Sequence, residues 1–234
     1  MFIFAHIFAG ALLGLLFWRL ANDRRALPFC IAGSVLPDLI DKSLGLLFPS
    51  VLASGRTVFH TLLIVLIILL SAVLFFRSVS RILVAGVGGA VLLHQIFDEM
   101  WTLPANWFYP LMGPFQGHMI PDYVGTYFWF EITNPSEWLF MIGTVLILAA
   151  SFKDSRLTSY NFLSDRMKTV INRVFAAVFI GTGLYLVIAG FATTSMTCIT
   201  PEYLNVPTVI AGALFLCGAG IMTRIPLFLP NNQF

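Results

Sequence analysis

The sequence predicts an all-α fold, a polytopic bundle of about seven transmembrane helices. Hydrophobic residues make up 59% of the 234 residues and charged residues only 10%, whereas soluble domains carry roughly 25% charged residues. The mean hydropathy is +0.90, and apolar stretches recur along the whole chain without a separate polar half. We therefore expect a single membrane domain over residues 1–234 and no soluble appendage.

Seven stretches are long and apolar enough to cross the roughly 30 Å of bilayer hydrocarbon. They cover residues 2–20, 27–48, 58–76, 82–97, 138–152, 170–191 and 206–222. The first has no basic residues before it and contains His6, so we interpret it as a retained span and not as a signal peptide. Pro37 and two aspartates interrupt the second, which predicts a short or broken helix that lines a cavity.

Lys and Arg are distributed unevenly between the connections, and cytoplasmic connections hold the excess of these residues. With the N-terminus outside, eleven of the thirteen basic residues lie at inner helix ends, and the C-terminus is cytoplasmic. The outer connections hold only Lys42 and Arg56. The inner set is Arg19, Arg24, Arg25, Arg77, Arg81, Lys153, Arg156, Arg166, Lys168, Arg173 and Arg224.

The longest connection, residues 100–137, contains no Lys or Arg but many aromatic residues. We interpret it as an outer lid at the membrane interface, either an aromatic belt at the headgroup level or an aromatic substrate box. A lid that faces lipid satisfies both interpretations. Residues 1–136 then form the half with the polar residues, and residues 138–234 are scaffold helices whose glycines permit close packing and which offer a surface for a protein partner.

Ionisable residues inside membrane spans are costly and usually face a cavity, pair with one another or bind ions. Here they gather at the outer ends of the first four spans, at His6, Asp38, His60, His94 and Asp98. The topology was inferred without these residues, yet it brings them together. Three imidazoles and two carboxylates suit one or two divalent metal ions. Zinc is the first candidate, and manganese and iron are the alternatives.

His94 and Asp98 are four residues apart, which puts them on one helical face. On their own they fit a metal site or a hydrogen-bonded structural couple. Asp41 fits three roles: a ligand, an acceptor that orients a histidine, or a surface partner of Lys42. Arg56 is placed either to bind an anionic phosphate or to extend its charge to the membrane interface. His118 fits the role of a second-metal ligand, a general acid or a structural residue.

Four segments carry a resemblance to a known family. His6 early in the first span, PDLID at residues 37–41, GRTVFHT at 55–61 and HQIFD at 94–98 resemble the membrane-bound metal-dependent hydrolases called YdjM-like, which LexA regulates in some bacteria. The order of these residues is also similar to that in the zinc-dependent phospholipase C and nuclease superfamily. The family often shows PDxD and HRGxTHS, where this chain has Ile40 and Gly55.

The resemblance implies phosphoester hydrolysis by a metal-activated water. His6, Asp38, His60, His94 and Asp98 would be the ligands, and Asp98 would be a candidate bridge between two ions. Asp41, Arg56 and His118 are our candidate catalytic residues. We expect membrane lipids as partners and a lipid or lipid-linked phosphoester as substrate, cleaved at the non-cytoplasmic face of the cell membrane, with an amide or glycan bond left open.

The composition also limits the alternatives. The net charge of +2 without a basic run argues against nucleic acid as a partner. Intramembrane His and Asp also suit a transporter with a metal or proton relay, an accessory subunit, or a structural bundle held by hydrogen bonds alone. A relay would need polar groups towards both faces of the membrane, and the sequence concentrates them at one.

Overall fold

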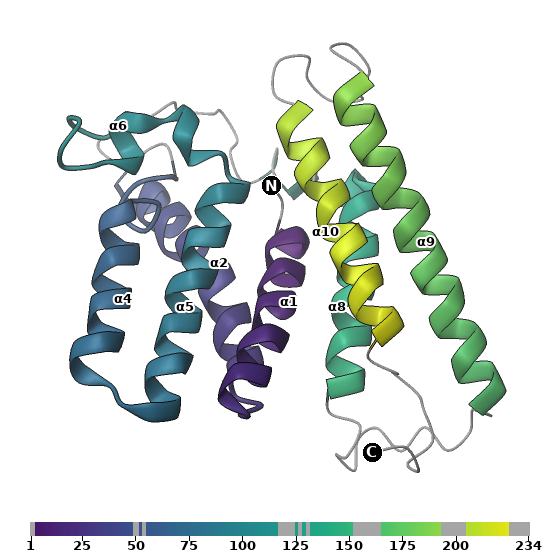
Figure 1. Ribbon diagram of the computed structural model, residues 1–234. Helices are drawn as coiled ribbons and strands as arrows, with labels where there is room; N and C mark the ends of the chain where they lie inside the picture. The colour runs from purple at the N-terminus through teal and green to yellow at the C-terminus, as the bar shows by residue number, and fades with distance from the viewer. Residues whose placement is uncertain are drawn as a thin grey trace. The chain divides into compact units, whose positions relative to one another are not determined.

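The computed structural model describes residues 3–48, 52, 55–116, 125, 128–129, 132–151, 165–192 and 205–224. Within these ranges the regular structure is entirely helical. The chain divides into two compact units, Met1–Met141 and Ile142–Phe234, and each is treated separately below. Figure 1 shows the order of the helices along the chain.

Each of the seven predicted spans falls on one long helix. Three of the described helices are long and apolar enough to cross a membrane: α1, α5 and the stretch Arg173–Gly190 of α9. The apolar helices α4, α8 and α10 are shorter by the same measure. The bounds are α1 Ile3–Ala21, α2 Ala26–Leu47, α4 Leu62–Phe75, α5 Ser78–Phe97, η1 Met100–Thr102, α6 Pro104–Trp107, α8 Pro135–Ser151, α9 Asp165–Ala192 and α10 Asn205–Arg224.

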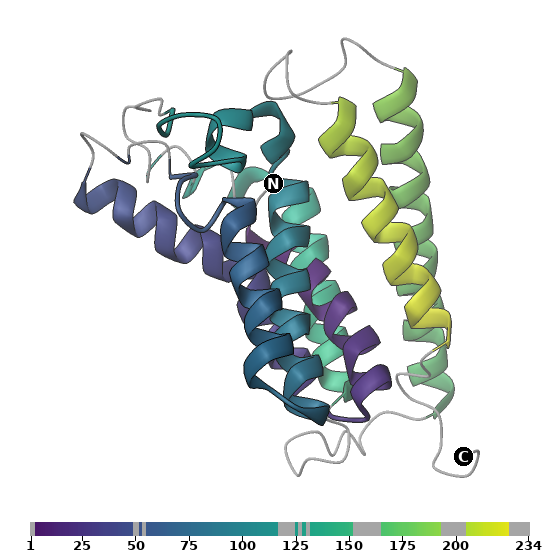
Figure 2. The ribbon, with the colours of Figure 1, turned by 60° about the vertical axis from the view of Figure 1, so that its left-hand side comes forward.

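In the first unit, α1, α2 and α5 pack against one another and α4 packs against α5, an arrangement that can be followed in Figures 1 and 2. Glycines make the closest approaches. A methyl group on Gly33 of α2 would lie 2.9 Å from the carbonyl oxygen of Val87 on α5, and one on Gly10 of α1 would collide with Ser34. These small residues bring the backbone of α2 close to both neighbours at the level of Ser34.

The helix α2 is continuous through Pro37, so the expected break in the second span does not occur. Proline removes the N–H that would bond the carbonyl four residues back, and its ring crowds that turn. The affected carbonyl belongs to Gly33, where α5 packs closely. Asp38 and Asp41 therefore follow the proline on an intact helix.

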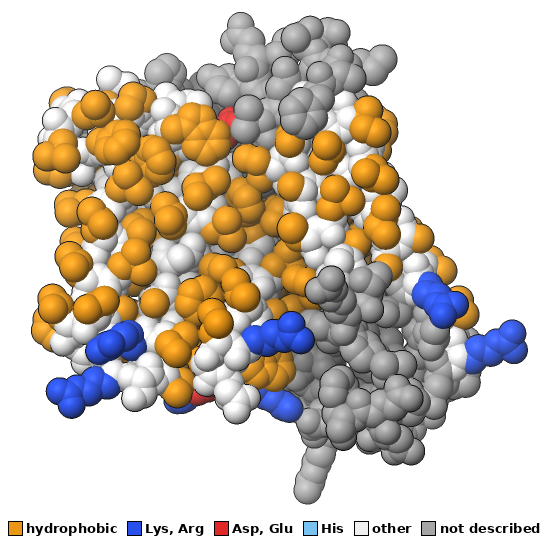
Figure 3. Space-filling model, in the orientation of Figure 1, with side chains coloured by type: hydrophobic (Ala, Val, Ile, Leu, Met, Phe, Trp, Pro, Cys, Tyr) orange, Lys and Arg blue, Asp and Glu red, His pale blue; other side chains and the backbone are white. Residues whose placement is uncertain are grey.

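Basic side chains gather at one end of the first unit. Arg19 ends α1, and Arg77 and Arg81 lie where α4 passes into α5. In the turn between α1 and α2, Arg25 binds the carboxylate of Asp23 at 2.7 Å, and this hydrogen bond lowers the pKa of Asp23. Figure 3 shows Lys and Arg side chains at this end and hydrophobic side chains over the flank above it.

The flank of α4 is strongly apolar. Exposed hydrophobic residues recur along its length, and patches of this size are unusual on soluble monomers. They suit contact with lipid acyl chains. The set is Leu63, Leu66, Ile67, Leu70, Val73, Leu74 and Phe75.

At the start of α8, the side chain of Asn134 accepts a hydrogen bond from the backbone N–H of Ser136 at 3.1 Å. The acid in its first turn does something the sequence did not indicate. Glu137 is 2% exposed, and its Oε2 accepts hydrogen bonds from the backbone N–H groups of Phe4 at 3.0 Å and Ala5 at 3.2 Å. It therefore satisfies donors at the start of α1 that have no partner within the helix.

The second unit is built on the pair α9 and α10. Gly183 and Gly212 face one another, because a methyl group on either would lie within 3 Å of the other's carbonyl oxygen. Phe179 and Phe215 pack edge to face beside them, with ring centroids 5.0 Å apart. Gly183 and Gly212 thus permit close helix packing as the sequence predicted, whereas a Cβ at Gly181 or Gly220 would meet open space among the described residues.

We predict that Glu137→Ala lowers the thermal unfolding midpoint of the protein in detergent, with a loss of about 1–2 kcal/mol, the typical value of a lost helix cap. The reason is that two buried backbone donors at the start of α1 lose their acceptor. Glu137→Gln retains an oxygen acceptor and should lose less. An alanine variant that melts like the wild type would contradict the capping role.

Candidate metal centre

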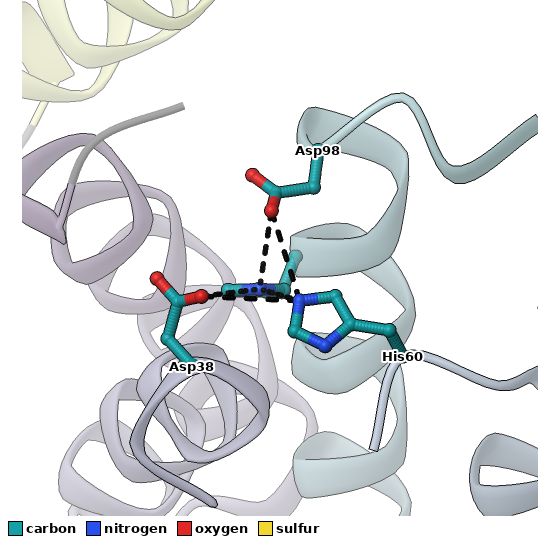
Figure 4. Close-up of side chains that lie close together, drawn as sticks. Asp38, His60 and Asp98 are labelled. Carbon is teal, nitrogen blue, oxygen red and sulfur yellow. Dashed lines mark hydrogen bonds and ion pairs between the residues drawn. The ribbon is translucent and has the colours of Figure 1, made fainter. Parts of the chain in front are cut away.

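Four buried side chains from three elements converge at the end of the first unit opposite the basic residues. Asp38 comes from α2, His60 from the segment before α4, and His94 from the last turn of α5, with Asp98 just after that helix. All four are at most 5% exposed. Each offers one ligand atom, and these four atoms lie within 4.8 Å of one another. Figure 4 shows Asp38, His60 and Asp98 pointing toward a common centre.

The distances between the ligand atoms are close to those around one ion. A zinc ion with ligands at roughly 2.0–2.1 Å in tetrahedral geometry separates them by about 3.3 Å. The Nε2 atoms of His60 and His94 are 3.1 Å apart. Each of these atoms lies 3.7–3.9 Å from Asp38 Oδ1 and Asp98 Oδ2.

The outer nitrogens of both imidazoles are engaged by buried acceptors. His94 Nδ1 lies 2.7 Å from the carbonyl oxygen of Ser34, which can only accept, so Nδ1 carries the proton. His60 Nδ1 lies 2.8 Å from Asp41 Oδ2 and donates in the same way. When neutral, each ring therefore presents an unprotonated Nε2 to the other, and two lone pairs at 3.1 Å repel unless a cation or a proton lies between them.

Asp41 holds the segment that carries His60. Its carboxylate is fully buried and accepts the backbone N–H groups of Thr57 at 2.8 Å, Phe59 at 3.0 Å and His60 at 3.1 Å. Of the three roles open from the sequence, this geometry is that of an acceptor that orients a histidine. Lys42 pairs with Asp38 at 2.6 Å.

Two buried amides, which the sequence analysis missed, hold the other side of the same segment. Gln95 donates to the carbonyl oxygens of Phe59 at 3.1 Å and Thr61 at 2.9 Å, and its Oε1 accepts from Trp107. Asn106 donates to the carbonyl oxygen of Arg56 at 2.8 Å. In the sequence, each of these residues is visible only as an isolated amide within an apolar or aromatic stretch. A polar side chain that is buried in such a stretch must find a hydrogen-bond partner.

Gly55 gives this segment a left-handed turn before Arg56. Gly55 has φ of +60°, in the left-handed region that glycine adopts without the steric cost of a Cβ. It precedes Arg56 directly, so the turn at Gly55 sets the direction in which the arginine enters the site.

His6 lies beside this group of four. Its Nε2 is 3.1 Å from Asp98 Oδ1, the oxygen that the other two histidines do not use. Its ring stacks on His94, with centroids 3.9 Å apart. Its buried Nδ1 has no hydrogen-bond partner among the described residues. His6 can therefore support Asp98 as a ligand or, with Asp98 Oδ1, contribute to a second ion.

Two cations contact the carboxylates from outside. Arg56 Nε lies 3.1 Å from Asp98 Oδ2, and Lys42 Nζ lies 2.6 Å from Asp38 Oδ2. Both cationic side chains are 35% exposed, whereas the two aspartate side chains are 4–6% exposed. Next to this group, burial raises the pKa of Glu99.

A divalent ion fits the donor set. Asp38 Oδ1 is buried and has no hydrogen-bond partner in the described part of the protein, although a buried carboxylate oxygen normally has one. It lies 3.8 Å from both imidazole Nε2 atoms. Two nitrogens and two carboxylate oxygens form a ligand set that zinc accepts, and manganese or iron also bind such ligands.

The structure thus brings together five of the expected ligands, with four around one centre and His6 on the far oxygen of Asp98. Arg56 reaches this group, and Asp41 lies behind His60. His118 lies outside the described residues, as do residues 117–124, 126–127 and 130–131 of the expected lid. The first part of that lid, residues 100–116, contains η1, α6 and the turn that follows them.

Comparison with known proteins gives a family and no reaction. No curated protein and no solved structure shows significant similarity to the chain. The family model described as YdjM inner membrane protein matches residues 1–196, which include every side chain of the centre. The chain therefore belongs to the YdjM inner membrane protein family.

Proposed function

We propose that the protein is a membrane-embedded, metal-dependent hydrolase that cleaves a phosphoester of a lipid or lipid-linked substrate at the non-cytoplasmic face. One observation carries this proposal: two imidazole nitrogens 3.1 Å apart face the same centre as a buried carboxylate oxygen that has no hydrogen-bond partner among the described residues. A divalent ion held at this centre would lower the pKa of a bound water towards neutrality and polarise a phosphoryl group. Zinc is the first choice, with one ion on Asp38, His60, His94 and Asp98.

The residues around the centre support this chemistry. Asp41 and the Ser34 carbonyl fix the imidazole orientations, so the two Nε2 atoms face inward before any ligand arrives. Arg56 is partly exposed and contacts Asp98, a position from which its guanidinium can bind a phosphate oxygen. The aromatic segment 100–116 follows the centre directly in the chain, and the indole N–H of Trp107 donates a hydrogen bond to the side chain of Gln95. We infer that this segment covers the lipid-facing entrance.

The main alternative is a proton or metal relay across the membrane. In the described residues, every buried histidine and carboxylate lies at the end of the first unit where α1 begins: His6, Asp38, Asp41, His60, His94, Asp98 and Glu137. A relay requires such groups along the whole path, and the opposite end carries exposed arginines. The hydrolase interpretation accounts better for this one-sided distribution.

The metal is tested by elemental analysis of detergent-purified protein prepared without chelator. We expect stoichiometric zinc, manganese or iron in the wild type and its loss in His94→Ala and Asp98→Ala, because each variant removes one of four ligands. Asp23→Asn, an exposed carboxylate in the turn between α1 and α2, is the matched control and should retain the metal. A wild type that is metal-free, and stays so after metal addition, would refute the centre.

The number of ions is tested by His6→Ala. If four ligands hold one ion, this variant keeps the wild-type stoichiometry with weaker binding, because Asp98 loses its hydrogen-bond partner. If His6 and Asp98 hold a second ion, the stoichiometry falls from two to one. Activity against lipid phosphoesters is then screened on the metal-loaded wild type, with His94→Ala as the inactive control.

The orienting role of Asp41 predicts a different phenotype from loss of a ligand. Asp41→Asn should weaken metal affinity by about 10–100-fold, as loss of a histidine-orienting partner typically does, while saturating metal still gives full stoichiometry. Competition with a chromophoric chelator measures both quantities. Asp98→Asn is the comparison, since it should reduce the stoichiometry itself. Wild-type affinity in Asp41→Asn would show that His60 needs no such partner.

The orientation of the protein is tested by cysteine labelling in intact cells. In a background without Cys30, Cys198 and Cys217, we expect a membrane-impermeant maleimide to label Leu111→Cys and not Ser80→Cys. Leu111 is 88% exposed in the segment beside the centre, and Ser80 is exposed at the basic end. Labelling of Ser80→Cys alone would place the centre on the cytoplasmic side and overturn the proposed orientation.

A further inference from the structure

The cations in contact with the metal-binding carboxylates are not explained by metal binding. Lys42 pairs with Asp38 and Arg56 pairs with Asp98, so both aspartates of the centre contact a positive charge. A fixed cation beside a ligand carboxylate repels an incoming metal ion and competes with it for the oxygen. Neutral donors, such as the backbone N–H groups that bind Asp41, orient a carboxylate without this penalty.

The charge of the group changes sign when a divalent ion binds. Three carboxylates, on Asp38, Asp41 and Asp98, stand against two cations, Lys42 and Arg56. With neutral histidines these five side chains, taken alone, carry a net charge of −1. One divalent ion raises the net charge to +1, and this charge lies largely out of water. The assembled centre therefore favours an anion, and one negative charge balances it.

The two cations are the members of this group that solvent can reach. They are the partly exposed members of the group, at 35% each, while the carboxylates beneath them are nearly buried. They come from two different elements, Lys42 from α2 and Arg56 from the segment before α4. The backbone of Arg56 is fixed by Asn106, which binds its carbonyl oxygen at 2.8 Å.

We propose that Lys42 and Arg56 form an anion clamp at the mouth of the centre, which recognises the phosphate group of the substrate from two sides. This inference rests on the proposed function and adds Lys42 as a residue that determines specificity for anionic substrates. In the metal-free centre the two cations pair with the aspartates. With a metal ion bound, they are placed to pair with the phosphate oxygens.

The clamp predicts opposite effects on metal and on phosphate. The test uses the full-length protein in detergent, loaded with Co²⁺, whose visible ligand-field spectrum reports the centre, and titrated with inorganic phosphate. We expect Lys42→Gln and Arg56→Gln to weaken phosphate binding about tenfold or more, the effect of losing one charge-assisted contact. Cobalt affinity should be unchanged or tighter in Lys42→Gln, because Asp38 loses a competing cation. Lys42→Arg should retain phosphate binding.

Arg77→Gln is the matched control, since it removes an exposed cation at the opposite end of the unit and should leave both affinities unchanged. The proposal is overturned if phosphate affinity is the same in both clamp variants and the wild type, or if cobalt and phosphate affinity fall together, as for a purely structural ion pair. A protein that binds cobalt without responding to phosphate refutes the clamp alone. One that binds no cobalt refutes the centre itself.

The source of the phosphate is separated by a second arm in bilayers. The cobalt-loaded protein is reconstituted into phosphatidylcholine vesicles with or without phosphatidic acid, and no free phosphate is added. A spectral change that requires phosphatidic acid and disappears in Lys42→Gln supports a lipid headgroup as the ligand. A change seen only after addition of inorganic phosphate supports a soluble phosphate held by the same clamp.

Discussion

The first unit depends on one buried carboxylate, that of Asp41. A charged group without contact with water is stable only when hydrogen bonds replace its hydration, and Asp41 obtains three from backbone N–H groups and one from His60. These donors all belong to the segment before α4. The same interaction therefore solvates the charge, folds an irregular segment and orients His60, a candidate metal ligand, and a change at Asp41 affects all three.

Residues 55–61, the irregular segment before α4, have backbone groups paired by buried side chains. Non-helical backbone near a membrane must be satisfied by protein groups or by water. Asp41 accepts from its N–H groups, while Gln95 and Asn106 donate to its carbonyl oxygens. His60 and Arg56 are consequently fixed by their backbone as well as by their side chains. This pre-arrangement is what a metal centre needs to bind an ion without reorganising.

Much of the fold was predictable because hydrophobicity and charge act on whole segments. All seven expected spans fall on helices, and the unequal distribution of Lys and Arg was enough to bring His60, His94 and Asp98 to the same end. The bonds that hold the centre were not predictable. Gln95 and Asn106 act through backbone groups far away in the chain, and Glu137 caps a helix more than 130 residues before it, so no local pattern records these partners.

The contacts of Asp41 account for the position of its acid, one residue after the position at which the resembled pattern has one. In the continuous helix α2, successive residues turn by about 100°, so position 40 lies nearly opposite Asp38, whereas position 41 lies close to the same face. An acid at position 41 can thus reach the segment that carries His60, and Ile40 lies on another side of the helix. Gly55 replaces a histidine of the pattern and adopts a left-handed conformation. Four residues around one centre, Asp38, His60, His94 and Asp98, could hold one ion, and a second ion would depend on His6 and the far oxygen of Asp98.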